Sequence, residues 1–309
     1  MDRRDFLKTA IRGGIIAGSG LALGGVGGLG RAAVAAEKGK DWDLVAVRGG
    51  EPEAMFDAAI EAYGGMGAFV PKGSKVVVKP NIGWDVPPER GANTHPALVG
   101  RIVTRCLEAG AKEVVVFDHT CDNWRQCYAT SGIGKAVEDA GGKMLSADSE
   151  GYYREVAVPR GKRLTKALVH QALLDADVFI NAPVLKDHSS TRLTAGMKNL
   201  MGVVWDRGYW HRNDLHQCIA DFASLRKPDL IVVDAYSIMK RNGPRGVSES
   251  DVAIMKAQIL SRDCVAADAA AAKLFGLEPG EIRHIQLASD MQLGRMDLND
   301  LAINRIKLG

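Results

Sequence analysis

Four short apolar runs, separated by helical patterns, constrain the fold more than any other feature of the sequence. They cover residues 75–78, 113–117, 178–180 and 230–233, and they are rich in valine and isoleucine. Runs this short and this apolar are typical of parallel strands that are buried on both faces. Because helical patterns lie between them, the sequence predicts an α/β fold of Rossmann-like type, with a mostly parallel sheet and helices on both faces.

The other expected elements agree with this fold class. A helix is expected over residues 96–109, because Pro96 follows three residues that can cap a helix, Asn93, Thr94 and His95. Further strands are expected at residues 43–47, 143–145, 258–260, 282–288 and 303–307, further helices at 52–63, 133–140, 166–174, 193–204, 213–225 and 263–275, and an irregular or hairpin excursion at 150–163. No linker, repeat or low-complexity tract interrupts residues 36–309, which we interpret as a single compact domain.

Polar residues follow each of the four apolar runs. Lys79 and Asn81 follow the first, Asp118 and His119 the second, Asn181 the third and Asp234 the fourth. The carboxyl ends of parallel strands lie at one edge of a sheet, where ligands bind in open α/β folds. Asn and Asp also favour turns, so each residue taken singly could be a turn residue. The recurrence at four strand ends predicts a functional site.

The segment 181–202 is the densest part of this pattern, and we expect it to form one wall of the site. Lys186 and His188 follow the strand almost at once, and Arg192, Lys198 and Asn199 come next. Clustered lysines lower one another's pKa, which can make one a base or a nucleophile, or they can neutralise a carboxylate or phosphate. Lys198 could instead be a surface lysine with its stem on apolar neighbours. The excess of cations predicts a small anionic ligand.

Roles can be assigned within this site. We expect His188 to be a general acid–base, since a loop histidine titrates near neutral pH. The other expected catalytic residues are Lys186, Lys198 and Asp118, and the expected ligand-binding residues are Lys79, Asn81, His95, Asn181, Arg192, Asn199, Asp234 and Arg245.

Cysteines and histidines leave two hypotheses open. Cys121 and Cys127 could close a small disulfide loop, or they could ligate a metal together with His119 and His211. The chain has five cysteines but no CxxC motif and no CxxCxxC run, so it lacks the spacing of a ferredoxin cluster. The cofactor is therefore unknown, with a metal ion or an iron–sulfur cluster as candidates.

The amino terminus has the order of regions found in an export signal. Arg3 and Arg4 precede Phe6, Leu7 and Lys8, a weakly apolar run covers residues 11–29, and an A-x-A site ends at residue 35. These features predict a twin-arginine (Tat) signal peptide over residues 1–35, the Tat export machinery as a partner and a periplasmic or extracytoplasmic location. An uncleaved leader would be a membrane anchor, the one membrane contact we expect. The G-x-G-x-x-G match at residues 25–30 has no strand before it and is discarded as a dinucleotide site.

The net charge of +3 comes from this leader. Residues 1–35 contain five basic and two acidic residues, which leaves 35 of the 40 basic and 35 of the 37 acidic residues in the rest of the chain. A mature chain with zero net charge has no global basic field to attract nucleic acid.

Six short motifs give the chain a family resemblance. They are Lys79-Pro80-Asn81, Thr94-His95-Pro96, Pro183-Val184-Leu185-Lys186-Asp187-His188, Lys198-Asn199-Leu200-Met201-Gly202, Gly243-Pro244-Arg245-Gly246 and Asp263-Cys264-Val265-Ala266-Ala267-Asp268. In this order they resemble the DUF362 family over nearly the whole of residues 36–309. The family is largely uncharacterised and gives no established roles for these residues. Many members carry a ferredoxin-type segment, which is missing here, and this sequence adds an export signal.

Three functions are compatible with these observations. The leading hypothesis is an exported enzyme or redox accessory protein that acts on a small anionic ligand. The second is a non-catalytic periplasmic carrier of a metal, an iron–sulfur cluster or a ligand. The third is an interaction module, in which the polar residues of the strand ends would be scattered over the surface.

Overall fold

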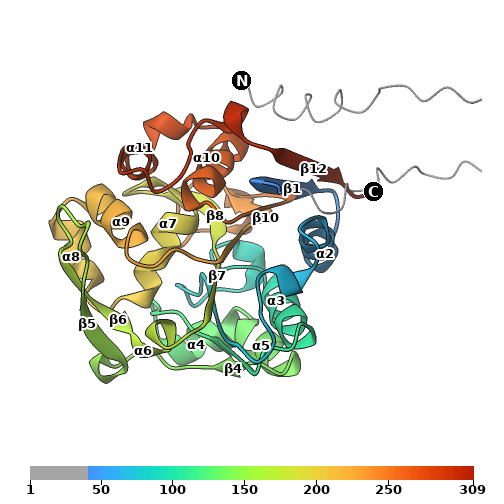
Figure 1. Ribbon diagram of the computed structural model, residues 1–309, viewed down its shortest axis with the longest axis horizontal. Coiled ribbons are helices and arrows are strands. Elements are labelled where there is room, and N and C mark those ends of the chain that lie inside the picture. The colour runs from blue at the N-terminus through green and yellow to red at the C-terminus, as the bar shows by residue number, and fades with distance from the viewer. Residues whose placement is uncertain (1–40) are drawn as a thin grey trace, which may run out of the picture.

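The computed structural model describes residues 41–309, so the predicted leader and its glycine run lie outside the described residues. The chain forms an α/β fold around a ten-stranded mixed sheet (Figure 1). The strands are β1 Leu44–Arg48, β2 Lys75–Pro80, β3 Glu113–Val116, β4 Lys143–Met144, β5 Tyr153–Ala157, β6 Lys166–His170, β7 Val178–Ala182, β8 Val184–His188, β9 Arg192–Thr194, β10 Leu230–Met239, β11 Val252–Ser261 and β12 Ile303–Lys307. The helices are α2 Pro52–Ala62, α3 Pro96–Glu108, α4 Trp124–Thr130, α5 Ile133–Asp139, α6 Gln171–Leu174, α7 Gly196–Asn199, α8 Arg207–Arg212, α9 Leu215–Ala223, α10 Cys264–Phe275 and α11 Arg283–Asp290.

The sheet is mostly parallel, as predicted. Its order is β12-β1-β11-β10-β7-β2-β3-β4, with β8 paired to β10 and β9. The central pairs β10–β7, β7–β2, β2–β3 and β3–β4 are parallel, whereas β11 runs antiparallel to both β10 and β1. The four apolar runs of the sequence are therefore neighbouring strands, and their carboxyl ends lie along one edge.

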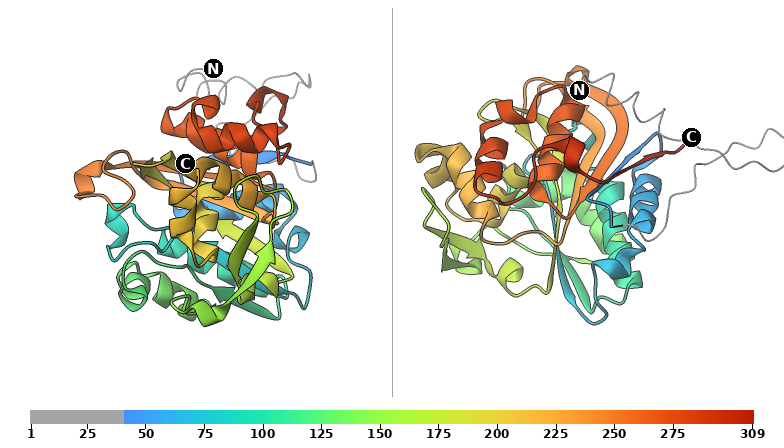
Figure 2. Two further views of the ribbon diagram at one scale, coloured as in Figure 1. Left: turned by 90° about the vertical axis from the view of Figure 1, so that its left-hand side faces the viewer. Right: turned by 45° about the horizontal axis from the view of Figure 1, so that its top comes forward.

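Both faces of this sheet are buried, because successive side chains of the central strands enter two different cores. Val77 and Phe179 belong to one core, while Val76, Val78 and Ile180 belong to the other. Helices α2, α3 and α5 pack in the second core and helices α7, α9, α10 and α11 in the first. Figure 2 shows these two sets of helices, coloured blue to green and yellow to red, on opposite sides of the sheet. The predicted layering is confirmed.

Two of the predicted elements are wrong. Residues 166–174 were expected to be helical but begin with strand β6, which pairs antiparallel with β5, and only residues 171–174 form a helix. Ala167 and Val169 alternate inward there, which is the period of a strand. Residues 282–288 were expected to be a strand but fall in helix α11, whose buried residues His284, Ile285 and Ala288 recur at helical spacing.

The segment 181–202 is more ordered than a loop. Strand β8 follows β7 after Pro183 and turns back as β9, and these two strands pair antiparallel. The helix expected from residue 193 begins only at Gly196 and continues as a 3-10 turn to Val203. Helices α4 and α8 were not predicted. Strands β10 and β11 are each ten residues long and extend beyond the short runs expected for them.

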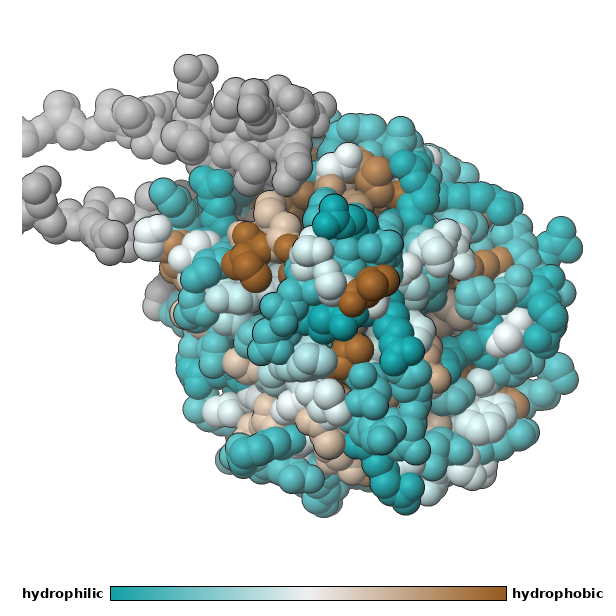
Figure 3. All heavy atoms as spheres, turned by 180° about the vertical axis from the view of Figure 1, so that it is seen from behind, coloured by the Kyte–Doolittle hydropathy of each residue, from teal (hydrophilic) through white to brown (hydrophobic). Residues whose placement is uncertain are grey.

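The described surface is mainly polar. On the face shown in Figure 3, apolar side chains are scattered among hydrophilic ones. Within residues 41–309, no helix combines the length and the apolar character needed to span a bilayer.

Candidate functional site

A cavity of about 430 Å³ lies at the edge of the sheet where the parallel strands end. We call it the lysine cavity. Its lining comes from strands β2, β8 and β9, the segment that follows β3, and helices α7 and α8. The lining residues are Lys79, Asn81, Gly83, Trp84, Asp118, His119, Cys121, Lys186, His188, Ser189, Ser190, Thr194, Lys198, Asn199, Met201, Gly202, Arg207, His211 and Pro244. The predicted convergence of strand ends is therefore present in the fold, and the scattering required by the interaction-module hypothesis is not.

The floor of the cavity is a buried ion pair. Lys79 Nζ lies 2.8 Å from Asp118 Oδ1, and both side chains are almost fully buried. Burial lowers the pKa of Lys79, and the Asp118 carboxylate opposes that shift. The second oxygen of Asp118 accepts a 2.7 Å hydrogen bond from the backbone N–H of Ile82. Asp118 therefore neutralises Lys79, so the pair adds little net charge to the cavity.

Gly202 makes this close approach of backbone and side chains feasible. A Cβ atom at this position would lie 1.8 Å from Asp118 Oδ1 and 2.6 Å from Lys79 Nζ. No side chain fits there unless the ion pair moves. The glycine is therefore required by the ion pair beside it.

Three asparagine side chains join the elements behind the lysines. Asn199 Nδ2 donates to Asn181 Oδ1 at 2.8 Å and to the Lys79 carbonyl at 3.2 Å. Asn199 Oδ1 accepts from Lys79 Nζ at 2.8 Å and from Asn81 Nδ2 at 3.0 Å. We call Asn81, Asn181 and Asn199 the amide network. It fixes α7 against strands β2 and β7.

Lys186 enters the cavity from β8 and has no carboxylate partner among the described residues. It is 1% exposed, and its Nζ donates to Asn81 Oδ1 at 3.0 Å and to the Ala92 carbonyl. Burial, together with the nearby cations Lys198 and Lys79, lowers the pKa of Lys186 to about 7. Neutral acceptors solvate this ammonium without neutralising it.

Lys198, on α7, is the second cation of this kind. Its side chain is partly buried, and Nζ forms no hydrogen bond or ion pair with residues 41–309. Burial and the neighbouring Arg207 lower the pKa of Lys198 to about 8. The alternative of a solvated surface lysine does not fit this environment, since Lys198 lines the cavity together with Lys79 and Lys186.

His188 is a neutral hydrogen-bonding residue. Burial first, and then the charges of Lys198 and Lys186, lower its pKa to about 2. The reason given for a general acid–base role, a pKa near neutrality, therefore does not hold. His188 Nδ1 accepts a 3.1 Å hydrogen bond from the backbone N–H of Ser190, which places the ring proton on Nε2. In this tautomer Nε2 is a donor.

The residues suggested as metal ligands do not form a ligand set. Cys121 is an exposed free thiol, Cys127 is a buried free thiol, and so the proposed disulfide is absent. His119 Nδ1 lies 2.9 Å from the Val204 carbonyl and its ring stacks on Trp205. Residues 41–309 contain no group of three or more His, Cys, Asp or Glu side chains arranged to hold a metal ion.

Five of the predicted ligand-binding residues do not line the cavity, namely His95, Asn181, Arg192, Asp234 and Arg245. His95 caps helix α3, and its backbone N–H donates to Asp234. Asp234 lies inside β10, because this strand continues to Met239. Arg192 pairs with Glu281 at 3.3 Å and Arg245 with Asp122 at 3.5 Å, both in exposed positions. Asn181 does not line the cavity but accepts a hydrogen bond from Asn199, which does.

Other cavity residues were not assigned roles from the sequence. Arg207 donates to the carbonyls of His119 and Thr120 at 2.7 and 2.8 Å, which fixes the segment after β3 against α8. Thr194 is 2% exposed, and its hydroxyl is buried without a hydrogen-bond partner among residues 41–309. A buried hydroxyl left unpaired costs about 1–3 kcal/mol, which a ligand in the cavity could recover. The run of hydroxyl side chains that follows His188 in the sequence was the signal that could have drawn attention to Thr194.

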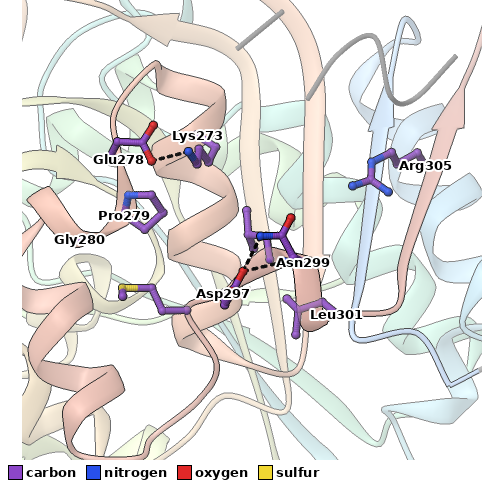
Figure 4. Close-up of a pocket in the computed structure, with 10 residues that line it drawn as sticks. Lys273, Glu278, Pro279, Gly280, Asp297, Asn299, Leu301 and Arg305 are labelled. Atoms are coloured by element: carbon purple, nitrogen blue, oxygen red, sulfur yellow. Dashed lines mark hydrogen bonds and ion pairs between the residues drawn. The ribbon is translucent and has the colours of Figure 1, made fainter. Parts of the chain in front are cut away.

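A second cavity, of about 540 Å³, is larger but has different chemistry (Figure 4). It lies where α10 ends, near the segment that leads to β12. Its Lys273 is paired with Glu278, and Asp297 accepts from the side chain of Asn299 at 2.8 Å. Charges of both signs are balanced there. The smaller lysine cavity, with its uncompensated ammonium groups, is the stronger candidate for function.

Fold and site together define an α/β protein with a cationic cavity at the carboxyl edge of a mostly parallel sheet. The chain belongs to the DUF362 family, described as a domain of unknown function, whose profile matches residues 76–273. It is 29% identical over 238 residues to the thylakoid-associated protein sll1697 of Synechocystis sp., covering 72% of this chain and 70% of the relative.

Among solved structures, the chain is similar to the lactate racemase apoprotein from Thermoanaerobacterium thermosaccharolyticum. The sequence identity is 12% and the TM-score 0.44 over 80% of this chain. The match spans 56% of the racemase chain.

Proposed function

We propose that this protein is an enzyme that binds a small anionic ligand in the lysine cavity. The observation that carries the proposal is the pair of lysines, Lys186 and Lys198, which line one cavity without a carboxylate partner among residues 41–309. Burying a cation without an opposite charge is costly, and proteins keep such groups chiefly where they meet a ligand. A carboxylate or phosphate would supply the missing negative charge.

The neighbouring groups suit an anion as well. Lys198 Nζ has all three donors available to a ligand, and Lys186 Nζ retains one after its two hydrogen bonds. His188 adds a neutral N–H donor, and the Thr194 hydroxyl adds another. Asp118 is the one acidic residue among the described lining residues, and it is paired with Lys79. The donors therefore outnumber the charged acceptors that a bound anion would meet.

Lys186 is the residue best suited to proton transfer. A general acid–base works best when its pKa is near the working pH, and burial brings the pKa of Lys186 to about 7. We therefore assign proton transfer to Lys186 and ligand orientation to His188. Lys198 would hold the anionic group, and its charge would be retained because a bound anion raises the pKa of a neighbouring ammonium.

Export from the cytoplasm and a Rossmann-like fold also form part of this proposal. Export by the twin-arginine route is supported by the sequence of residues 1–35. The name of the cyanobacterial relative associates that protein with thylakoids, which is compatible with action near a membrane. A Rossmann-like arrangement of the sheet is supported by the parallel strands β2, β3 and β7, whose carboxyl ends lie at one edge. A redox accessory role would use the same cavity.

Isothermal titration of the full chain with phosphate and with small mono- and dicarboxylates tests the proposal. We expect saturable binding by at least one of these anions, and a loss of at least about tenfold in affinity in Lys198→Met and in Lys186→Met. Lys135→Met is the matched control, because Lys135 is exposed and paired with Asp139 on helix α5. Equal affinity in wild type and both cavity variants would exclude the cavity as the anion site.

A further inference from the structure

Cys121 differs from the other cysteines of the chain. All five are free thiols, but Cys106, Cys127, Cys218 and Cys264 are buried, and only Cys121 is exposed. Burial raises the pKa of Cys127 to about 11 and that of Cys264 to about 12, so both remain protonated thiols at neutral pH. Cys121 also lines the lysine cavity.

The sulfur of Cys121 lies against a cation that is fixed in place. Arg207 Nη1 is 3.5 Å from Cys121 Sγ, and the same guanidinium is anchored by its two hydrogen bonds to the backbone carbonyls of His119 and Thr120. On the other side, the Cys121 backbone N–H donates to the Gly83 carbonyl at 2.8 Å. The backbone of Cys121 is therefore fixed on the cavity wall, and its sulfur contacts an anchored guanidinium.

The rest of the cavity adds to this positive field. Lys186 and Lys198 line the same space, and the one acidic residue of the described lining, Asp118, is already paired with Lys79. These cations would attract an anionic electrophile to the cavity that Cys121 lines. The unpaired Thr194 hydroxyl in the same cavity is a separate indication that this cavity binds a ligand.

We propose that Cys121 is a nucleophilic thiol of the lysine cavity and forms a covalent bond to an anionic electrophile bound there. The inference rests on the proposed function, since the cationic groups that bind the anion would also bring it into the cavity that Cys121 lines. In the step, the Cys121 sulfur attacks an electrophilic carbon, the bond from that carbon to its leaving group breaks, and the leaving group departs with the electron pair. The thiol proton passes to solvent, to which Cys121 is exposed.

Alkylation of the full chain with two simple probes tests this inference. Iodoacetate is an anion and iodoacetamide is its neutral analogue, and both form a thioether with loss of iodide. At pH 7, with peptide mapping by mass spectrometry, we expect Cys121 to be modified first. We expect the ratio of the iodoacetate rate to the iodoacetamide rate at Cys121 to exceed that of a free small thiol by about tenfold, because a cationic cleft concentrates anions. Lys198→Met should lower this ratio, and Lys135→Met should leave it unchanged.

The outcomes separate the two proposals. Modification of Cys121 no faster than that of the buried Cys127 would overturn the inference, and the anion site would still stand if phosphate binds by titration. Rapid modification of Cys121 without any preference for iodoacetate would overturn the anion site, and the anionic electrophile with it. Protection of Cys121 by a saturating bound anion would support both.

Discussion

Replacing Lys198 by methionine is expected to make the protein more stable while it weakens anion binding. The ammonium of Lys198 is partly buried and makes no hydrogen bond or ion pair within residues 41–309, so the substitution removes a charge without leaving a partner unsatisfied. Methionine has a similar length and suits an apolar environment. The side chain thus destabilises the ligand-free fold, and its removal should raise the free energy of unfolding.

The size of this effect follows from the pKa. Burial lowers the pKa of Lys198 from 10.5 to about 8, and at about 1.4 kcal/mol for each pKa unit the charged form costs at most about 3–4 kcal/mol at pH 7. Because the side chain is partly hydrated, we expect about half of that, roughly 2 kcal/mol. The folded pKa lies below the unfolded one, so the cost is fully present below about pH 8 and disappears as the pH rises past 10.5.

Urea unfolding of wild type and of Lys198→Met at several pH values measures this difference. The variant should be more stable at pH 7, the gap should narrow at pH 9, and the two proteins should converge near pH 10.5. Lys135→Met, an exposed substitution, should show no such dependence on pH. The reasoning is refuted if the variant is less stable than wild type at pH 7, or if the gap does not change between pH 7 and 10.

Further predictions concern the residues around the cavity. Gly202→Ala should lower the free energy of unfolding by at least about 3 kcal/mol, because its Cβ displaces a buried ion pair. Gly67→Ala is the control and should change the free energy of unfolding little, since no atom lies within 4 Å of its Cβ. Chemical denaturation compares the two variants. Lys79→Met should cost about 3–5 kcal/mol by leaving Asp118 unpaired, and adding Asp118→Asn should recover at least half of that loss in the same assay. Burial raises the pKa of Asp268 to about 7, so its protonated form stabilises the fold at low pH and this stability is lost as the pH rises through 7. The free energy of unfolding of wild type relative to that of Asp268→Asn should therefore fall by about 2–3 kcal/mol between pH 5 and pH 8. Denaturation curves of both proteins at constant ionic strength measure this difference. A difference that does not change with pH would contradict the raised pKa of Asp268.

The central strands could be predicted from the sequence because their burial is visible in local composition. Residues 75–78 and 178–180 are apolar on both faces, and both are parallel strands between two helical layers. Elements that depend on tertiary partners were missed. Strand β6 forms because β5 is available to pair with it. The sequence of α11 resembles that of a strand, since its apolar residues are few and closely spaced.

The convergence of the strand-end side chains on one cavity was also predictable, but their charge states were not. Lys79, Asp118 and Lys186 follow apolar strands, so topology alone brings them to one edge. The charge state of a side chain depends instead on burial and on neighbours from distant segments. His188 has the sequence context of a titrating loop histidine, yet desolvation, and then the nearby ammonium groups, lower its pKa and keep it neutral. Asp234 was misplaced for a simpler reason, since nothing in the sequence shows that β10 continues beyond it.

The amide network separates the shape of the cavity from its charge. Asn81, Asn181 and Asn199 hold strands β2 and β7 against α7 through groups that do not ionise, so protons do not alter these bonds. Lys186 and Lys198, in contrast, change their charge between about pH 7 and pH 8. The pH of the surrounding compartment would then set the affinity of the cavity for an anionic ligand, while the dimensions of the cavity stay the same.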